Sequence, residues 1–220
     1  KEKGVWINQM NNLKTMLSDN AFDNISHEHL EYYSLSSLEF LLARHDLEVF
    51  DVELNSLNGG SIRAYIAHTG DYPIDERVHN LRDSEKDLNT FIPYKEFVDR
   101  IKELKTIMFD FISAKHKAGK SIYVYGASTR GNTLLQYFDL DNTMLTAAVE
   151  RNPVKWGKRM AETNIPIISE DEARKAKPNY MLVLPWAFIK EFVVRESEYL
   201  QSGGRFIVPL PKFRVLSADN

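Results

Sequence analysis

The second half of the chain alternates regularly between strand-like and helix-like segments, and this alternation constrains the fold most. Short apolar runs of strand length are separated by segments with helical periodicity and by glycine-rich turns. Strands are expected at 121–125, 146–150, 180–184 and 205–208, and helices from the 126–133 turn to 138, at 170–175 and at 187–201. Strands joined by helices form a parallel sheet, because a parallel neighbour needs a long crossover. The pattern therefore predicts an α/β fold with a parallel sheet.

The first 70 residues are organised differently, with two helices and three strands. Asn-Ser-Leu-Asn-Gly-Gly at 55–60 contains residues that tolerate a positive φ, so it favours a turn between two strands that pair antiparallel. Asn11 or Asn12 is expected to cap the first helix, and the Ser36/Glu39 spacing predicts a capping box for the second. The expected strands are 4–10, 47–54 and 61–68, and the expected helices end at Leu17 and near Asp46. The segment predicts the closing part of an α/β domain whose first strands are missing.

Residues 69–93 form a polar connector, with a short helix expected around 75–88. Residues 94–117 carry apolar side chains every three or four positions, which predicts a long amphipathic helix that stops at Gly119. We therefore divide the chain into a first domain at 1–70, a connector with a bridging helix at 71–118, and a second domain at 119–220.

Composition excludes several classes of protein. The chain of 220 residues has no cysteine, which rules out disulfides and cysteine zinc sites within it. Its 28 basic and 31 acidic residues show no excess of positive charge, so neither nucleic acid nor an anionic membrane is an expected partner. No apolar run approaches the ~20 residues that span a bilayer. We expect a cytoplasmic protein, and the start without methionine suggests a piece of a longer chain.

The sequence His27-Glu28-His29 is the first candidate for chemistry. Histidine titrates near neutral pH, so a histidine pair in a loop is suited to proton transfer. One interpretation is a general base oriented by the glutamate, and a second is a metal site, although no third ligand at convincing spacing is present. The third interpretation is structural, a histidine pair that stabilises a turn before a helix. The residues alone leave all three open.

The turn that follows the strand at 121–125 is the second candidate. It reads Gly-Ala-Ser-Thr-Arg-Gly-Asn-Thr at 126–133, so Gly126, Ser128 and Asn132 flank Arg130 where a helix begins. Such a turn can present backbone N–H groups to a phosphate, with the arginine adding a charged contact. Glu150 ends the next strand, where an acidic residue often binds a ribose. The spacing is not that of a dinucleotide fingerprint, and a simple tight turn is the alternative.

Two further sites are weaker. Residues 58–63 contain Gly59, Gly60 and a following serine and arginine; these glycines form a turn or let the backbone approach a ligand. Trp186 follows the strand at 180–184, where it stacks on a ligand ring or packs in the core. The substrate-binding candidates of the whole chain are His27, Asn58, Gly59, Gly60, Ser61, Arg63, Gly126, Ser128, Arg130, Asn132, Glu150 and Trp186.

Several ordered motifs together resemble sugar C-methyltransferases that use S-adenosylmethionine. They run from Phe22-Asp-Asn-Ile-Ser-His-Glu-His through Leu47-Glu-Val-Phe-Asp-Val and Gly59-Gly-Ser-Ile-Arg to the second half. There the motifs are Tyr125-Gly-Ala-Ser-Thr-Arg-Gly-Asn-Thr, Glu150-Arg-Asn-Pro-Val-Lys-Trp-Gly-Lys, Ile165-Pro-Ile, Leu182-Val-Leu-Pro-Trp and Gly204-Arg-Phe-Ile-Val-Pro-Leu-Pro. The resemblance implies a partial class I methyltransferase-like segment followed by a Rossmann-like domain with a parallel sheet.

The resemblance also implies a function. Such enzymes have a cysteine-bearing zinc domain, a domain that binds S-adenosylmethionine and a C-terminal domain that helps hold a nucleotide-linked keto sugar; zinc and most of the cofactor site would lie outside this chain. His29 corresponds to the base that removes a proton from the carbon next to the ketone, and Glu28 to the residue that orients it. Ser26 stands where some relatives carry a tyrosine, and relatives often carry aspartate at the position of His27 and lysine at that of Arg130. The alternatives are a nucleotide-sugar binding module without catalysis and a metal-dependent enzyme built on the two histidines.

Overall fold

The computed structural model describes residues 3–219, with the side chain of Asn58 also outside the described part. The chain forms two compact units. Unit 1 comprises the chain up to Ala21 together with Glu28–Asp99, and unit 2 comprises Phe22–His27 together with the chain from Arg100 onward. These units describe packing, and the three-part domain division remains a prediction.

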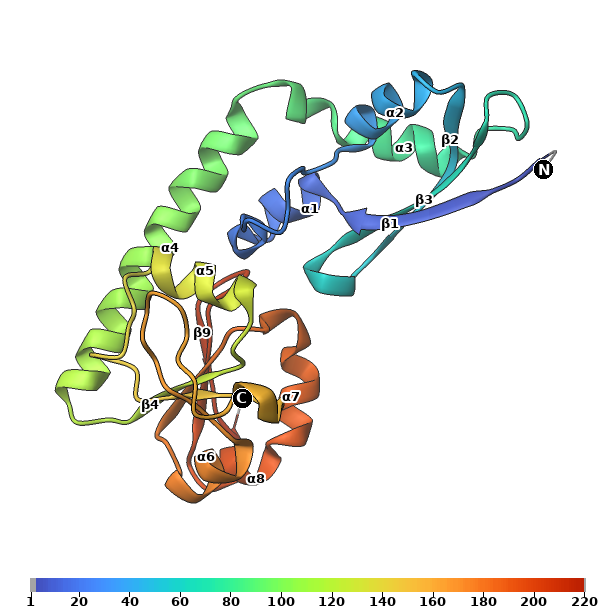
Figure 1. The fold of residues 1–220 in the computed structure, drawn as a ribbon. Coiled ribbons are helices and arrows are strands. Elements are labelled where there is room, and N and C mark those ends of the chain that lie inside the picture. Colours follow the sequence, from blue (N-terminus) through green and yellow to red (C-terminus); the bar gives the residue numbers. More distant parts are fainter. Residues whose placement is uncertain (1–2, 220) are drawn as a thin grey trace. The chain divides into compact units, whose positions relative to one another are not determined.

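Unit 1 is built on a three-stranded antiparallel sheet in the order β1-β3-β2 (Figure 1). Its strands are β1 (Trp6–Asn11), β2 (Leu47–Asn55) and β3 (Ser61–His68). The predicted antiparallel pairing of the two strands around the glycine turn is confirmed, with Asn55 opposite Ser61. Central β3 alternates buried side chains with more exposed ones, as a strand covered on one face should.

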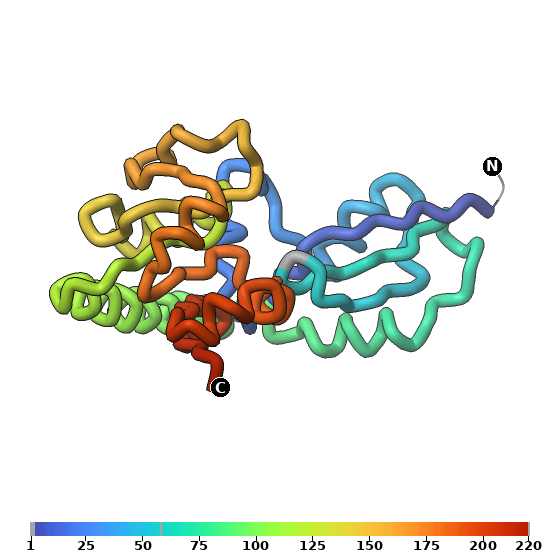
Figure 2. Tube along the Cα trace, turned by 90° about the horizontal axis from the view of Figure 1, so that it is seen from below, coloured from blue at the N-terminus to red at the C-terminus, as the bar shows by residue number. Residues whose placement is uncertain are grey.

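Helices α2 (Leu35–Ala43) and α3 (Glu76–Ser84) cover one face of this sheet, and α3 can be followed along the strands in Figure 2. Their leucines and the buried aliphatic side chains of β2 and β3 form one core. It contains Leu35, Leu38, Leu42, Val49, Val52, Ile62, Ala64, Ile66, Val78 and Leu81. Short α1 (Leu13–Ser18) follows β1, and two 3-10 helices lie at Leu57–Gly59 and Lys86–Asn89.

The caps of the first two helices test the sequence predictions. Asn12 caps α1, as expected, because its Oδ1 accepts the Thr15 N–H at 2.8 Å. The predicted box of Ser36 and Glu39 is wrong: the cap of α2 is Ser34, whose Oγ accepts from the backbone of Ser37. The helix starts two residues earlier because Ser34 is buried where the chain enters the core, whereas Ser36 is exposed.

The long helix α4 (Ile92–Lys117) confirms the predicted amphipathic helix. Its buried stripe has spacings of three and four residues and consists of Phe97, Ile101, Leu104, Met108 and Ile112. Phe111 was expected in this stripe but is only half-buried, and its ring meets Tyr180 edge-on at 5.8 Å. Gly119 has a φ of 70°, which confirms it as the stop.

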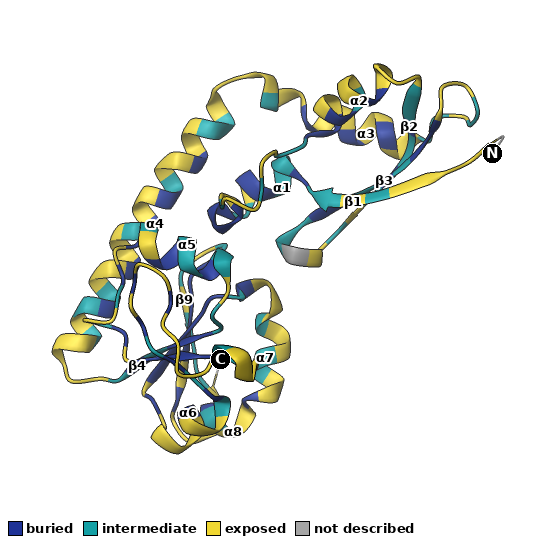
Figure 3. Cartoon of the chain, in the orientation of Figure 1, coloured by how far each residue is buried: buried dark blue, intermediate teal, exposed yellow. Residues whose placement is uncertain are grey.

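Unit 2 contains a six-stranded sheet in the order β6-β5-β4-β7-β8-β9 (Figure 1). All neighbours are parallel except β8 and β9, which confirms the predicted parallel α/β sheet. The strands are β4 (Ile122–Tyr125), β5 (Ala148–Val149), β6 (Ile167–Ile168), β7 (Tyr180–Val183), β8 (Arg205–Val208) and β9 (Arg214–Leu216). Figure 3 shows the buried core strands of this unit in dark blue, in contrast to exposed β1 of unit 1.

Strands β6 and β9 were not predicted, and the sheet continues beyond the prolines at 209 and 211. After these prolines the chain turns and adds β9 as an antiparallel edge strand, with Phe206 opposite Leu216. Two or three residues of strand carry too little alternation to be recognised in a sequence. An edge strand also has one solvent-facing side, so its composition is less constrained.

Both faces of the second sheet are covered by helices, which explains the nearly continuous burial of its strands. Helices α4 and α5 (Thr129–Tyr137) lie together on one face, where Lys105 of α4 sits over the Tyr137 ring. The other face is covered by α6 (Glu170–Ala176), α7 (Ile189–Arg195) and α8 (Ser197–Gln201). The core on that side consists of Tyr125, Val149, Ala173, Met181, Val183, Leu200 and Phe206.

The single helix predicted at 187–201 is wrong, because it is interrupted at Glu196. A 3-10 turn (Trp186–Phe188) precedes α7, and Glu196 separates α7 from α8. Glu196 is buried and accepts hydrogen bonds from Tyr125 Oη at 2.9 Å and from Arg174 at 2.9 Å. This side chain must point into the protein to meet both partners, and helical periodicity alone does not reveal that.

None of the helices in the described part of the chain is both long enough and apolar enough to cross a bilayer.

Candidate functional site

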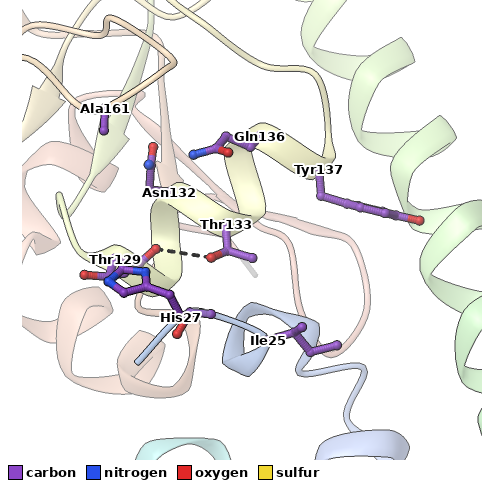
Figure 4. A pocket seen from close by; sticks show the side chains of 9 residues that line it. Ile25, His27, Thr129, Asn132, Thr133, Gln136, Tyr137 and Ala161 are labelled. Atoms are coloured by element: carbon purple, nitrogen blue, oxygen red, sulfur yellow. Dashed lines mark hydrogen bonds between the residues drawn. The ribbon is translucent and has the colours of Figure 1, made fainter. Parts of the chain in front are cut away.

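The site is a hollow of about 630 Å³ in unit 2, between helix α5 and the segment that begins the histidine motif (Figure 4). Every lining residue belongs to unit 2. The lining consists of Ile25, Ser26, His27, Thr129, Asn132, Thr133, Gln136, Tyr137 and Ala161. The sequence predicted His27 and Asn132 as binding residues, and the structure brings these two residues to the same hollow.

Helix α5 supplies one wall because of its residue spacing. Thr129, Asn132, Thr133 and Gln136 lie at positions i, i+3, i+4 and i+7, so they share one helical face. The opposite, apolar face of the helix places Leu134 and Leu135 in the core. Ser128 starts the helix as its N-cap, with its Oγ accepting from the Gly131 N–H at 3.1 Å.

Two oxygen atoms of residues that line the hollow are themselves buried and without a hydrogen-bond partner within the described residues. They are Ser26 Oγ and Asn132 Oδ1. Buried polar atoms are nearly always paired in folded proteins, because an unpaired one costs about 1–3 kcal/mol. Neither oxygen presents accessible surface to the hollow, so the two are a local cost of packing in its wall and do not by themselves mark a ligand.

A buried ion pair holds the segment 22–27 in place beside the hollow. Asp23 is only 2% exposed, and its Oδ2 accepts from Arg130 Nη2 at 2.8 Å and Nε at 3.1 Å. The indole N–H of Trp186, itself buried, donates to the same oxygen at 3.2 Å. Burial raises the pKa of Asp23 above its usual value, although the charge of Arg130 and both hydrogen bonds act in the opposite direction. Arg130 and Trp186, predicted to bind substrate, thus both contact this carboxylate.

Aromatic packing fixes the same segment from its other side. The Phe22 ring lies 4.9 Å from that of Tyr137 and 5.4 Å from that of Phe138, centre to centre. The start of the histidine motif is therefore part of the second unit's core, which explains why its backbone is well placed to line the hollow.

The Gly126 turn is braced by its predicted acidic partner. Glu150 accepts the Ala127 N–H at 3.3 Å and the Asn152 N–H at 3.1 Å, and Lys155 Nζ reaches it at 3.2 Å. Burial would raise the pKa of Glu150, but the Asn152 N–H and Lys155 together hold it below its ordinary value. Gly126 has a φ of 95°, and a Cβ there would meet Pro185 at 2.9 Å. The turn is thus tightly packed, and the carboxylate already uses one of its backbone donors.

The glycine turn of unit 1 has mainly structural contacts. A Cβ on Gly60 would lie 2.1 Å from a methyl carbon of Thr15, and Gly59 has a φ of 87°. Ser61 is buried and donates to the Leu57 carbonyl at 2.9 Å, while Arg63 pairs with Glu53 at 3.0 Å. Asn58 was also predicted as a binding residue, but its side chain lies outside the described part of the structure.

The remaining two histidine-motif residues fall in the other unit. The boundary between the units passes between His27 and Glu28. Glu28 is exposed and His29 is half-buried, and both take part in interactions within the chain. Within residues 3–219, no group of three or more histidine and acidic side chains is arranged to hold a metal ion. The metal hypothesis thus finds no support among the described residues.

Comparison with known proteins supports the resemblance seen in the sequence. Residues 56–211 match the model of the C-methyltransferase C-terminal domain. The chain belongs to this family. It is also 33% identical over 220 residues to the C-methyltransferase NovU of Streptomyces niveus, a match covering 99% of this chain and 52% of NovU. The chain thus spans about half the length of the curated relative it matches.

The C-methyltransferase C-terminal domain family match covers β3, α4 and nearly all of unit 2, including the Gly126 turn and the α5 wall of the hollow. The predicted family and its α/β fold are therefore confirmed. The segment 22–27 lies outside the matched range but within the similarity to NovU, which runs through 99% of the chain. The family assignment alone would thus not draw attention to Asp23 and Ser26.

Sequence reasoning missed several residues that the structure brings to this site. Asp23 and Ser26 were quoted only within the histidine motif, Thr129 and Thr133 only within the 126–133 turn, and Gln136 only as part of a helix. A signal existed for the last three, since polar residues with helical spacing opposite an apolar face predict a polar wall. No signal pairs Asp23 with Arg130, which is 107 positions away.

Proposed function

We propose that this chain is part of a C-methyltransferase that methylates the carbon next to the ketone of a nucleotide-linked keto sugar. The observation that carries the proposal is the family match over residues 56–211, together with the 33% identity to NovU. The hollow of unit 2 supports it, since its hydroxyl, amide and imidazole side chains are able to hydrogen-bond a sugar ring.

His29 is the proposed base, and Glu28 the residue that orients it or the sugar. A carbon next to a ketone is acidic enough for a positioned imidazole to remove its proton, and the usual pKa of histidine suits this step near neutral pH. The proton moves from that carbon to a ring nitrogen of His29. In this proposal the second unit binds the substrate.

S-adenosylmethionine is the proposed methyl donor of the whole protein, but the described residues do not form an evident site for it. In unit 2, Pro185 packs directly against Gly126 in the turn. Glu150 stands at the position where a ribose would bind, but it is already paired with backbone N–H groups and with Lys155. We propose that the cofactor binds mostly outside the described residues. Calorimetry with S-adenosylmethionine should then show weak or no binding to this chain, whereas tight binding would contradict the proposal.

Deuterium exchange tests the catalytic step. In the whole protein, His29→Ala should abolish exchange at the carbon next to the ketone as well as methyl transfer, because both need the same base. His45→Ala, at an exposed histidine, is the matched control and should leave both rates unchanged. If His29→Ala retains exchange, the base lies elsewhere. If the unaltered protein binds sugar nucleotides but never exchanges, the binding-module alternative is correct.

A further inference from the structure

A second, smaller hollow lies at the edge of the unit 2 sheet where three strands begin. Its volume is about 150 Å³, and its lining consists of Lys120, Asn179, Tyr180, Gly203 and Arg205. These residues stand at or just before the starts of β4, β7 and β8, which are parallel neighbours in the sheet. Parallel strands start at one edge, so this strand-start hollow lies at the edge opposite the Gly126 turn, which follows β4. None of the binding residues predicted from the sequence lines it.

Two cations without a carboxylate partner line the strand-start hollow. Lys120 and Arg205 are both exposed, and within residues 3–219 neither makes an ion pair. By contrast, Arg130 and Lys155 at the opposite edge are both paired with carboxylates. No aspartate or glutamate is among the lining residues of the strand-start hollow. It therefore carries positive charge that the described part of the chain does not neutralise.

Asn179 adds an uncharged donor whose orientation is fixed. Its Oδ1 accepts the backbone N–H of Ser121 at 3.0 Å, and a backbone N–H can only donate. The amide oxygen must therefore face Ser121, which leaves the NH2 group on the other branch of the amide. Asn179 is exposed, and among the described residues this NH2 group has no hydrogen-bond partner. The hollow thus offers N–H donors from three side chains and a carboxylate from none.

The Arg205 side chain is held in place at the hollow. Its backbone N–H donates to Tyr199 Oη at 3.1 Å, and its Nη1 donates to Tyr180 Oη at 3.3 Å. The guanidinium carbon lies 6.0 Å from the centre of the Tyr180 ring, and the Lys115 ammonium lies 5.9 Å from the same centre. The other N–H groups of this guanidinium make no hydrogen bond within the part of the chain that the structure describes. A guanidinium that is already positioned loses less freedom when it binds a ligand.

The sequence around the hollow also lacks negative charge. The segments that contain the three strand starts include no aspartate or glutamate; they are 111–138, 173–190 and 199–218. The basic residues in the last turns of α4 and α6 have an ordinary role, since cations there offset the partial negative charge of the helix carbonyls. Lys120 and Arg205 lie beyond the helix ends, so that role does not account for them.

The size of the hollow limits the size of its ligand. Drug-sized and cofactor-sized ligands bind in hollows of about 300–1,000 Å³, and this one has about 150 Å³. A water molecule takes about 30 Å³ in the liquid, so the space equals that of about five waters. It suits one phosphate or sulfate group, which accepts hydrogen bonds on each oxygen and binds most strongly to charged donors.

We propose that the strand-start hollow binds a single tetrahedral oxyanion, a phosphate or sulfate group, through Lys120, Asn179 and Arg205. The bound ion joins the starts of three neighbouring strands and therefore stabilises folded unit 2. The inference goes beyond the proposed function, because the hollow lies at the opposite edge of the sheet from the Gly126 turn and contains no predicted substrate-binding residue.

Titration of the chain with phosphate, sulfate and chloride at constant ionic strength tests the proposal. Heteronuclear NMR follows the side-chain NH2 signals of Asn179, with those of Asn142, an exposed residue outside the hollow, as the internal reference. The Asn179 signals should move and saturate with phosphate and with sulfate but not with chloride, and the Asn142 signals should stay in place. Thermal unfolding should shift to higher temperature with the two oxyanions.

A further titration with thymidine diphosphate distinguishes the source of the oxyanion. If the Asn179 signals move with phosphate and stay in place with the nucleotide, the hollow takes the free ion. If they move with both, it also takes the phosphate group of a larger molecule.

Asn179→Asp is the sharpest variant, because aspartate keeps an oxygen for the Ser121 N–H and replaces the NH2 donor with a negatively charged oxygen. It should abolish oxyanion binding, measured on the backbone N–H signal of Gly203. Asn142→Asp is the matched control, since it adds the same charge to the same unit outside the hollow, and it should bind like the unaltered chain.

Removal of either cation should weaken binding without changing the shape of the sheet edge. Lys120→Gln and Arg205→Gln should each raise the dissociation constant about tenfold, as expected for the loss of one charged hydrogen-bond donor. Lys190→Gln, at an exposed residue elsewhere on unit 2, is the control and should leave the dissociation constant unchanged.

Several outcomes overturn the proposal. One is the absence of any Asn179 shift with phosphate and sulfate, a result that needs no variant to fold. Others are an equal shift with chloride and an equal loss of affinity in Lys120→Gln and Lys190→Gln, because either would mean that the unit attracts anions only through its net charge. Deuterium exchange at the keto sugar has no part in these measurements, so failure of the proposed function leaves their result unaffected.

Discussion

At the scale of single residues, Asp23 anchors the start of the histidine motif to the second unit through its contacts with Arg130 and Trp186. Its carboxylate is buried, and one of its oxygens accepts hydrogen bonds from both Arg130 and Trp186. A buried pair of this kind contributes little net stability while intact, but removal of one partner leaves the other uncompensated. Asp23 is therefore critical to this part of the fold although it was not a predicted site residue.

Asp23→Ala should destabilise unit 2 by about 3 kcal/mol, because Arg130 and the Trp186 indole lose their shared acceptor. The measurement is urea unfolding followed by tryptophan fluorescence, to which Trp156 and Trp186 of unit 2 contribute alongside Trp6 of unit 1. Asp139→Asn is the control: Asp139 also pairs with a cation, Lys105, but is 64% exposed, so loss of this charge should cost less than about 1 kcal/mol, and asparagine tolerates the positive φ of 55° at this position. Equal effects of the two variants would contradict this account.

Glu150 should make stability depend on pH. Its pKa in the folded protein lies below its ordinary value of 4.5, since the Asn152 N–H and Lys155 outweigh the effect of burial. Its contribution is therefore fully present above about pH 4.5 and is lost as the pH falls through the lowered value. Urea unfolding at a series of pH values between about 6 and 3 should show a smaller loss for Glu150→Gln than for the unaltered chain. An identical pH dependence of the two proteins would show that Glu150 does not act in this way.

At the scale of elements, helix ends depend on buried partners that local sequence does not specify. The first N–H of α2, that of Leu35, donates to Glu85 at 2.7 Å, and the other oxygen of Glu85 accepts from Asn12 at 2.8 Å. Asn12 is also the cap of α1. One buried glutamate thus joins the starts of two helices to the end of α3, and burial raises its pKa. This network, together with the Ser34 cap, sets where α2 begins.

Two neighbouring serines test where α2 begins. Ser34→Ala should cost about 1 kcal/mol of unfolding free energy, because the Ser37 N–H loses its acceptor at the helix start. Ser36→Ala should change it by less than about 0.5 kcal/mol, since Ser36 is exposed within the first turn. Thermal unfolding of both variants distinguishes the two positions. A larger loss of stability for Ser36→Ala than for Ser34→Ala would support the capping box predicted from the sequence.

At the scale of the whole molecule, the chain crosses between two separately packed units three times. It leaves unit 1 after Ala21, returns after His27 and crosses again after Asp99, within α4. Each unit has its own apolar core, and the two cores share no residue. The histidine motif is consequently divided, with His27 in one unit and His29 in the other.

Separate cores should unfold separately. Ile66→Ala should remove roughly 3 kcal/mol from unit 1 and Leu182→Ala a similar amount from unit 2, because both side chains are fully buried. Hydrogen exchange measured by mass spectrometry should show lost protection in the strands of the altered unit and unchanged protection in those of the other. Loss of protection across both units in either variant would show that they unfold as one.

The sequence by itself determined the α/β class, the parallel direction of the second sheet's main strands, the long helix α4 and the family. Hydrophobic periodicity and turn residues act over a few positions, so a reader of the sequence can see them. It also supplied His27 and Asn132, although it gave no reason to place them in one hollow.

Only the tertiary structure decided which polar residues meet. It paired Asp23 with Arg130, turned Glu196 inward to divide a predicted helix, set the start of α2 at Ser34 and added β9 to the sheet edge. Each of these outcomes depends on a partner many positions away, or on burial that no local pattern encodes. A polar group that is removed from water needs a hydrogen-bond partner, and in this chain the partner often lies far away in the sequence. The contacts of the site are therefore defined only in the folded structure.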